Sequence, residues 1–118
     1  TAYRRQRQMC IRDRKMNVSI DDLSIMISRG LAKIAKEVVT SEDSISGVFS
    51  SGGDITVAIT EELRSDGIEI REEVQPLVAY GRIINGLKPG IKIVSKGGMV
   101  GSKNVMVECV KRILSEGE

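Results

Sequence analysis

The sequence predicts an α/β domain in which layered helices cover a mostly parallel sheet and glycine-rich loops lead from strands into helices. With 41% apolar and 29% charged residues among 118, the chain falls in the ordinary range for one soluble globular domain. One Phe, two Tyr and no Trp leave Ile, Val, Leu, Met and Ala to build the core, which suits buried strands packed under helices. Twice, an apolar segment meets a glycine pair just before a helical pattern.

The first helix is expected to run from Ser19 to about Val39. Ser19 is a suitable N-cap, and Asp21 and Asp22 are favourable in the first helical turn. Apolar residues recur here at intervals of three and four and therefore share one face of the helix: Ile20, Leu23, Ile27, Leu31, Ile34 and Val38. The polar residues 40–46 are expected to form a loop that leads into a short strand, 47–50.

The middle of the chain predicts a second helix over about 54–64, ended by Gly67. Its apolar side consists of Ile55, Ala58, Ile59 and Leu63. Residues 68–74 alternate between apolar and charged, which indicates a half-exposed strand that Pro76 interrupts. A further apolar stretch, 77–84, precedes a turn at 85–90 and the last strand, 91–95.

A C-terminal helix follows the glycine-rich segment 96–101, with Ser102 as a candidate cap. Its apolar positions are Val105 or Met106, Cys109, Val110, Ile113 and Leu114.

Several classes of site and location are excluded or made improbable by what the sequence lacks. Because there is no histidine, Ser-His-Asp and Cys-His catalysis and histidine-based zinc sites are excluded. Cys10 and Cys109 show no CxxC spacing and suit a reducing compartment. The apolar runs are far shorter than the roughly 20 residues that a bilayer demands, and no signal peptide is visible, so we expect no membrane association and a cytoplasmic location.

Residues 1–15 differ from the rest of the chain. They hold six Lys and Arg against one Asp, a net charge of +5, so the remainder carries −3 of the total +2. A basic arm could bind nucleic acid, but the remainder offers no basic face or stacking platform, and we expect no nucleic-acid partner. The string at 5–14 resembles translated sequencing-adapter read-through. We therefore expect residues 1–15 to be a non-native, disordered tail.

The two glycine pairs are candidate phosphate sites. The first amides of a helix lack internal partners, and glycine lets a phosphate approach the backbone without a Cβ in the way. In a parallel sheet both loops would lie at the carboxyl ends of their strands, where open α/β sheets bind ligands. The candidate ligand-binding residues are Gly52, Gly53 and Asp54 in the first loop and Lys96, Gly97 and Gly98 in the second.

Each of these signals has a structural alternative. Either glycine pair could be a simple tight turn, since neither fits the GxxxxGK[ST] or GxGxxG pattern. Lys96 could place its ammonium on a β- or γ-phosphate, or be a solvated loop residue. Asp54 could hold Mg²⁺ directly or through water, or only stabilise the first turn of its helix.

Four stretches in this order resemble the nucleotide-binding domain of the four-carbon acid sugar kinases. They are Ser51-Gly52-Gly53-Asp54, the segment 73–81 (Glu-Val-Gln-Pro-Leu-Val-Ala-Tyr-Gly), Gly86-Leu87-Lys88, and the segment 93–101 (Ile-Val-Ser-Lys-Gly-Gly-Met-Val-Gly). The resemblance covers about residues 17–115, and it identifies 16–118 as a partial nucleotide-binding domain. It departs from the family at Ile55, where many relatives have Thr, so that the nearest hydroxyl is on Thr56.

The resemblance implies a cofactor, a substrate class and a reaction. In that family the C-terminal domain binds ATP with Mg²⁺, the N-terminal domain binds a four-carbon sugar acid of the threonate, erythronate or 3-oxo-tetronate type, and phosphate passes between them. The catalytic base is then expected on the missing N-terminal half, so this fragment alone should be inactive. A homodimer is one option for the assembly, and the oligomeric state is left open. A non-catalytic module that binds a nucleotide or a phosphorylated metabolite remains the alternative function.

Overall fold

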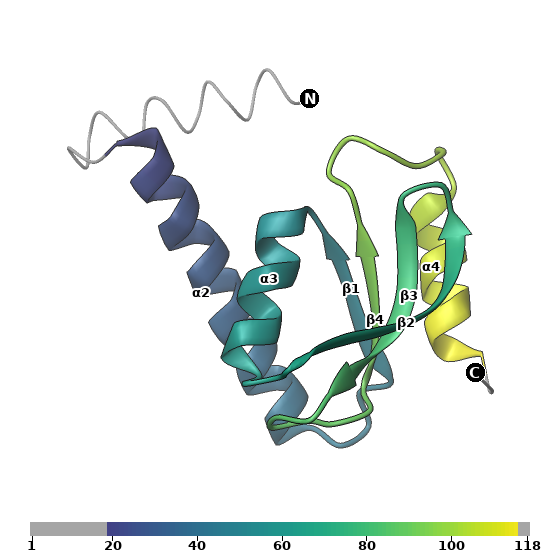
Figure 1. Ribbon diagram of the computed structural model, residues 1–118, viewed down its shortest axis with the longest axis horizontal. Helices are drawn as coiled ribbons and strands as arrows, with labels where there is room; N and C mark the ends of the chain where they lie inside the picture. The colour runs from purple at the N-terminus through teal and green to yellow at the C-terminus, as the bar shows by residue number, and fades with distance from the viewer. Residues whose placement is uncertain (1–18, 116–118) are drawn as a thin grey trace.

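The computed structural model describes residues 19–115, which form three helices and a sheet of four strands (Figure 1). The interpretation of residues 1–15 as a non-native tail lies outside the described residues and stays a prediction. The elements, in chain order, are α2 (Ile20–Ser41), β1 (Gly47–Ser51), α3 (Gly53–Glu62), β2 (Gly67–Gln75), β3 (Val78–Ile84), β4 (Lys92–Lys96) and α4 (Val105–Leu114). The predicted helices and strands are confirmed to within a few residues at their ends.

The predicted mostly parallel sheet is wrong. The strand order is β1-β4-β3-β2, in which only β1 and β4 are parallel, while β4 and β3 and then β3 and β2 are antiparallel. The reason is the length of the connections: two residues join β2 to β3 and seven join β3 to β4, whereas a parallel connection needs a crossover of a dozen residues or more. Pro76 and Leu77, the latter at φ 64°, form the tight turn between β2 and β3.

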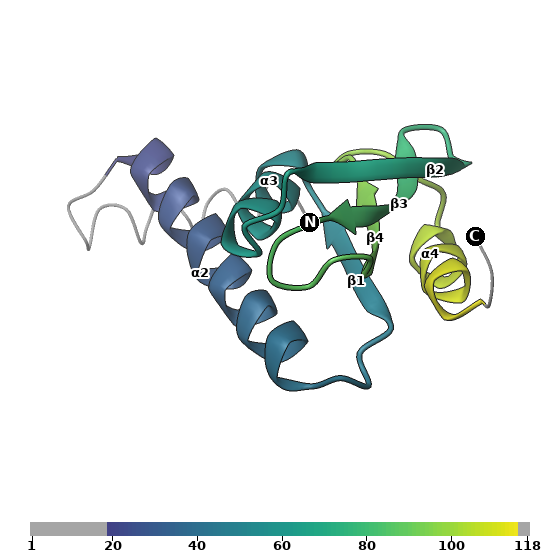
Figure 2. The same ribbon diagram turned by 60° about the horizontal axis from the view of Figure 1, so that its bottom comes forward.

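The sheet is covered on both faces. α3 packs against one face, with α2 on its outer side, and α4 packs against the other (Figure 2). Neighbouring residues of β4 serve the two cores in turn, because side chains alternate along a strand. Ile93 lies in the core beneath α2 and α3, and Val94 lies in the core beneath α4.

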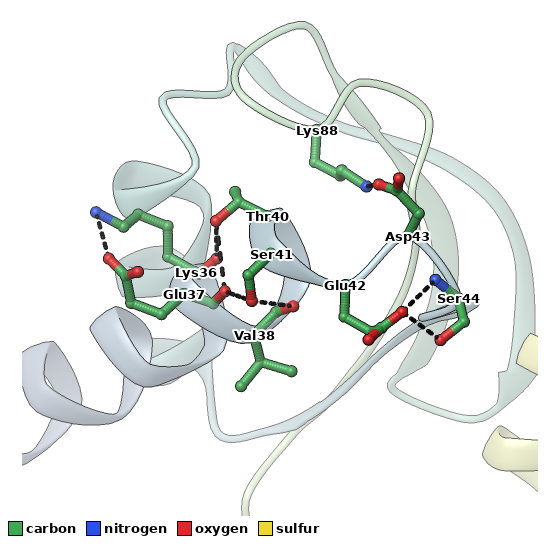
Figure 3. A network of polar contacts seen from close by, with 9 residues as sticks. All are labelled: Lys36, Glu37, Val38, Thr40, Ser41, Glu42, Asp43, Ser44 and Lys88. Atoms are coloured by element: carbon green, nitrogen blue, oxygen red, sulfur yellow. Dashed lines mark hydrogen bonds and ion pairs between the residues drawn. The ribbon is translucent and has the colours of Figure 1, made fainter.

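Hydroxyl side chains bond to the backbone near both ends of α2. The predicted N-cap is confirmed, since Ser19 Oγ accepts a hydrogen bond from the Asp22 amide at 3.1 Å. At the other end the hydroxyls of Thr40 and Ser41 donate to main-chain carbonyls of the last turn (Figure 3). Hydroxyls near a helix end offer the backbone a partner other than the next helical amide, which favours termination there.

The loop after α2 is held by short polar contacts that Figure 3 shows. The Ser44 hydroxyl and amide both donate to the carboxylate of Glu42, which lowers the pKa of that carboxyl below its ordinary value. Asp43 pairs with Lys88 at 3.2 Å, so the loop is tied to the turn between β3 and β4.

The apolar face that the spacing placed on α2 is largely uncovered. Ile34 is 62% exposed and Leu31 46%, whereas the nearby Ala32 and Val39 are buried against the core. Alanine lets two helices approach closely, so α2 turns its small residues toward α3. A row of larger apolar side chains on α2, made of Ile27, Leu31, Ile34 and Val38, is left facing outward. No helix within residues 19–115 is long and apolar enough to cross a bilayer.

Two predicted helix boundaries are corrected. α3 ends at Glu62, ahead of Gly67, which instead begins β2, and Arg64 adopts the left-handed conformation at φ 55°. α4 begins at Val105 with Asn104, not Ser102, at its cap position. Ser102 is used elsewhere: Gln75 donates to its hydroxyl and accepts from its amide, which ties the loop before α4 to the end of β2.

Candidate nucleotide-binding site

The structure brings the two glycine pairs side by side. β1 and β4 are parallel neighbours, with Ser51 in register with Lys96, so both strands end at the same edge of the sheet. The Gly52 amide continues the pairing one residue further and donates to the Lys96 carbonyl at 2.7 Å. A Cβ built on Gly98 would lie 4.0 Å from the Gly52 Cα. The two glycine loops therefore lie next to each other at this edge of the sheet.

The first glycine pair leads directly into a helix. Gly52, at φ 110°, occupies the N-cap position, and Gly53 begins α3. Amides in the first turn of a helix have no partner within it, and they lie at the positive end of the helix dipole. A Cβ built on Gly53 would have no atom within 4 Å, so the approach to these amides is open. The junction has the properties of an anion-binding site.

The second glycine pair does not lead directly into a helix. Residues 97–104 form a loop, and α4 begins only at Val105, so Gly97 and Gly98 do not adjoin its first turn. The Val100 amide donates to the Gly97 carbonyl at 3.3 Å, which closes a turn. The helix-dipole argument therefore applies to the first loop alone, and the second can offer only backbone groups and its lysine.

Lys96 is folded onto its own loop. Its ammonium donates to the carbonyls of Gly97 at 2.7 Å and Val100 at 3.0 Å, with Gly98 at 3.5 Å. An ammonium has three N–H donors, and these carbonyls can occupy all of them. Lys96 is half-exposed, and its ammonium is turned back onto the loop. It shapes the glycine loop, and it lies where its positive charge would also attract a phosphate.

Asp54 lies at the edge of the site. It is exposed as the second residue of α3, and it lines a groove between α3 and α2. Within residues 19–115 no three Asp, Glu, Cys or His side chains gather into a metal-binding cluster. Mg²⁺ often uses only one or two carboxylates and takes its other ligands from phosphates and water. Asp54 thus fits such an ion when a polyphosphate is present.

A cluster of hydroxyls beneath the two loops was not anticipated as a unit. Thr56 Oγ1 donates to the Gly52 carbonyl at 3.0 Å and lies 2.8 Å from Ser50 Oγ and 2.9 Å from Ser95 Oγ. It connects the ends of β1 and β4 to the first turn of α3. The sequence did carry a signal, because the pattern Ser-x-Gly-Gly occurs twice, at 50–53 and at 95–98.

The remaining stretches of the resemblance serve the fold. A Cβ on Gly81 would overlap the Glu69 carbonyl of the neighbouring strand. Gly86, at φ 83°, lies against the last turn of α3, where the Leu87 amide donates to the Leu63 carbonyl at 2.7 Å. Gly81 and Gly86 hold the β2–β3 pair and the end of α3 in place. The segment 73–81 also reaches the second glycine loop, because the Gly97 amide donates to the Leu77 carbonyl at 3.4 Å.

Comparison with known proteins gives the chain its family. The family model of the nucleotide-binding C-terminal domain matches residues 2–106. D-erythronate kinase of Heliobacterium modesticaldum is 39% identical over 100 residues, which are 84% of this chain and 23% of that protein. This chain belongs to the four-carbon acid sugar kinase family. D-threonate kinase of Salmonella typhimurium is 26% identical over 96 residues, which are 81% of this chain and 22% of that protein.

Solved structures show a similar fold. A domain of unknown function from Bordetella bronchiseptica, solved with bound citrate as a domain-swapped dimer in two crystal forms, superposes with TM-scores of 0.69 and 0.71. The sequence identities are 29% and 27%, over 73% and 81% of this chain and 22% and 23% of the solved chains. The chain spans about a quarter of the length of the curated relatives it matches.

Proposed function

We propose that this chain is the ATP-binding part of a cytoplasmic kinase that phosphorylates a four-carbon acid sugar of the threonate, erythronate or 3-oxo-tetronate type. The observation that carries the proposal is the placement of the two glycine pairs. They follow the parallel strands β1 and β4 at one edge of the sheet, with the start of α3 beside them. Relatives named D-erythronate and D-threonate kinase support the substrate class.

The residues of the chain would act by holding the polyphosphate. The first-turn amides at Gly53 and Asp54 would donate to phosphate oxygens, and the Lys96 ammonium would lower the electrostatic cost of gathering negative charge between the loops. Asp54 would hold Mg²⁺ directly or through water. When bound, the ion neutralises charge that develops on the phosphates during transfer. The base that accepts the sugar hydroxyl proton would lie on a separate substrate-binding domain, so this chain alone would transfer no phosphate.

The test of the nucleotide site is calorimetric titration of ATP with Mg²⁺ into the 118-residue chain and its Gly53→Ala variant. Ala at this position meets no neighbouring atom, and Gly53 has no positive φ, so the fold should be preserved while a methyl group stands in the approach to the amides. We expect affinity to fall by roughly tenfold. Gly30→Ala in α2, also without neighbours, is the matched control and should bind like the unmodified chain.

Two results would contradict the nucleotide site. One is a folded, unmodified chain that shows no binding at millimolar ATP. The other is equal affinity in Gly53→Ala and the unmodified chain, since α3 would then take no part in the contact.

The test of kinase activity replaces the matching segment of the Heliobacterium D-erythronate kinase by residues 16–118 of this chain. We expect ATP-dependent phosphorylation of D-erythronate, measured by ADP release. A folded chimera that binds ATP and transfers no phosphate would favour a non-catalytic nucleotide-binding module. The proposal includes a homodimer for the intact enzyme, because the solved relatives are domain-swapped dimers, and light scattering of the chimera measures its mass.

A further inference from the structure

A groove runs between α2 and α3, and none of the four glycines of the two loops lines it. Its volume is about 280 Å³, and α2 contributes Ser24, Ile25, Ser28 and Arg29 to its lining. On α3 the lining positions recur at intervals of three and four along the side that faces α2. The volume lies near the lower end of the roughly 300–1,000 Å³ that small-molecule sites occupy.

Apolar and polar side chains both line the groove. Ile25 on α2 and Val57 on α3 line the groove and are 59% and 55% exposed. Ala58, which also lines it, is buried. Two large apolar side chains that remain exposed in one groove suit a flat, largely apolar ligand group. Ser24 and Ser28, half-buried in the lining, supply hydroxyls that can bond to a sugar.

The two ends of the groove differ. At one end Arg29 pairs with Glu61 at 2.6 Å, which presents both hydrogen-bond donors and acceptors. At the other end lies Asp54, whose neighbour Gly53 begins α3 in the candidate phosphate site. A ligand that places its phosphates on the glycine pairs could therefore extend along α3 into this groove without leaving the protein surface.

We infer that the groove between α2 and α3 takes the nucleoside of the bound nucleotide. This inference rests on the proposed function and specifies it. The base lies between Ile25 and Val57, the ribose hydroxyls face Ser24 and Ser28, and the Arg29–Glu61 pair meets the polar edge of the base. α2 thereby becomes part of the ligand site, although none of the four family-like stretches lies on it.

The experiment compares ATP with inorganic tripolyphosphate, each with Mg²⁺, by calorimetry on the 118-residue chain. The test variant is Ile25→Gln/Val57→Gln, which removes the apolar walls without adding charge. The matched control is Met106→Gln/Val107→Gln on α4, where the original side chains are 60% and 55% exposed. We expect the test variant to lose roughly tenfold in ATP affinity and less than about twofold in tripolyphosphate affinity, and the control to change neither by more than about twofold.

The two probes separate failure of the inference from failure of the proposed function. If tripolyphosphate and ATP bind equally and the test variant binds ATP normally, the groove assignment is overturned while the phosphate site stands. If neither probe binds the folded chain, the phosphate site and the groove assignment both fall.

A second measurement needs no substitution. In methyl-labelled chain, the Ile25 and Val57 signals should shift with ATP and stay in place with tripolyphosphate. Unshifted signals at saturating ATP would overturn the inference even if the variants proved unstable.

Discussion

Replacing Thr56 by Val should destabilise the domain by about 1.5–4.5 kcal/mol. The exchange keeps the shape of a side chain that is only 7% exposed and removes its hydroxyl. Because Thr56 Oγ1 donates to the Gly52 carbonyl, both serine hydroxyls must donate to Thr56, and its one donor and two acceptors are all used. The carbonyl keeps the Thr56 amide as a partner at 3.2 Å. The cost therefore falls on the two serines.

The magnitude follows from their burial. Ser50 is 2% exposed and would be left without an acceptor, which costs about 1–3 kcal/mol, and the half-buried Ser95 adds about 0.5–1.5 kcal/mol for a lost hydrogen bond. Urea unfolding followed by circular dichroism measures the change. Thr56→Ser keeps the hydroxyl and should lose only about 1 kcal/mol for the methyl group.

A second substitution tests the reason for the loss. Ser50→Ala in the Thr56→Val background removes the unsatisfied hydroxyl and should restore part of the stability, since replacing both partners by apolar groups is far less costly than replacing one. The reasoning is refuted if Thr56→Val unfolds within about 0.5 kcal/mol of the unmodified chain, or if adding Ser50→Ala only deepens the loss.

Three further predictions concern the scaffold. Gly30→Ala should raise the free energy of unfolding by about 0.5–1 kcal/mol, because Gly30 lies inside α2 and a Cβ added there would have no atom within 4 Å; an unchanged urea midpoint would contradict this. Gly81→Ala should lower the free energy of unfolding by more than about 2 kcal/mol, because its Cβ would overlap the Glu69 carbonyl of the neighbouring strand. A variant as stable as the unmodified chain would contradict this, since β2 and β3 would then be able to make room for the methyl group. Burial raises the pKa of the Cys109 thiol above its ordinary 9.0. The folded chain therefore holds this proton at a pH where the unfolded chain has lost it, and the free energy of unfolding should fall as the pH rises from about 9 toward the raised pKa. Cys109→Ala should abolish this pH dependence, and a dependence that persists would belong to another group.

The helices were predictable because their signals are local. Ser19 and its acidic neighbours determine where α2 begins, and the pattern from Ile55 to Leu63 places the buried side of α3 correctly. Turn chemistry likewise identified the break at Pro76. Each of these depends on residues within one or two turns of the chain, so the amino-acid order is sufficient.

The sheet and the buried side of α2 depend on partners that local patterns do not reveal. Short connections indicate antiparallel neighbours, but the glycine pairs suggested a parallel sheet, and only one parallel pair is present. On α2 the apolar arc is so wide that spacing could not decide between the side with Ala32 and the side with Leu31.

The candidate site shows the same division between local and long-range information. The two glycine pairs were recognisable from the sequence, and the structure places them together. The contact of Lys96 with the Gly97 and Val100 carbonyls could not be predicted, since it depends on how the loop turns back over its own lysine.

The parallel pairing of β1 with β4 also has a consequence for the order of folding. Gly47 pairs with Lys92, and the chain between them contains α3 and the whole β2–β3 hairpin. Pairing of such distant residues carries a larger loop-closure cost than closing the two-residue turn at Pro76 and Leu77. The hairpin should therefore gain protection from hydrogen exchange early in refolding. The two glycine loops should come together only in the final phase. A ligand bound at the proposed nucleotide site would then slow unfolding without accelerating the first steps of refolding.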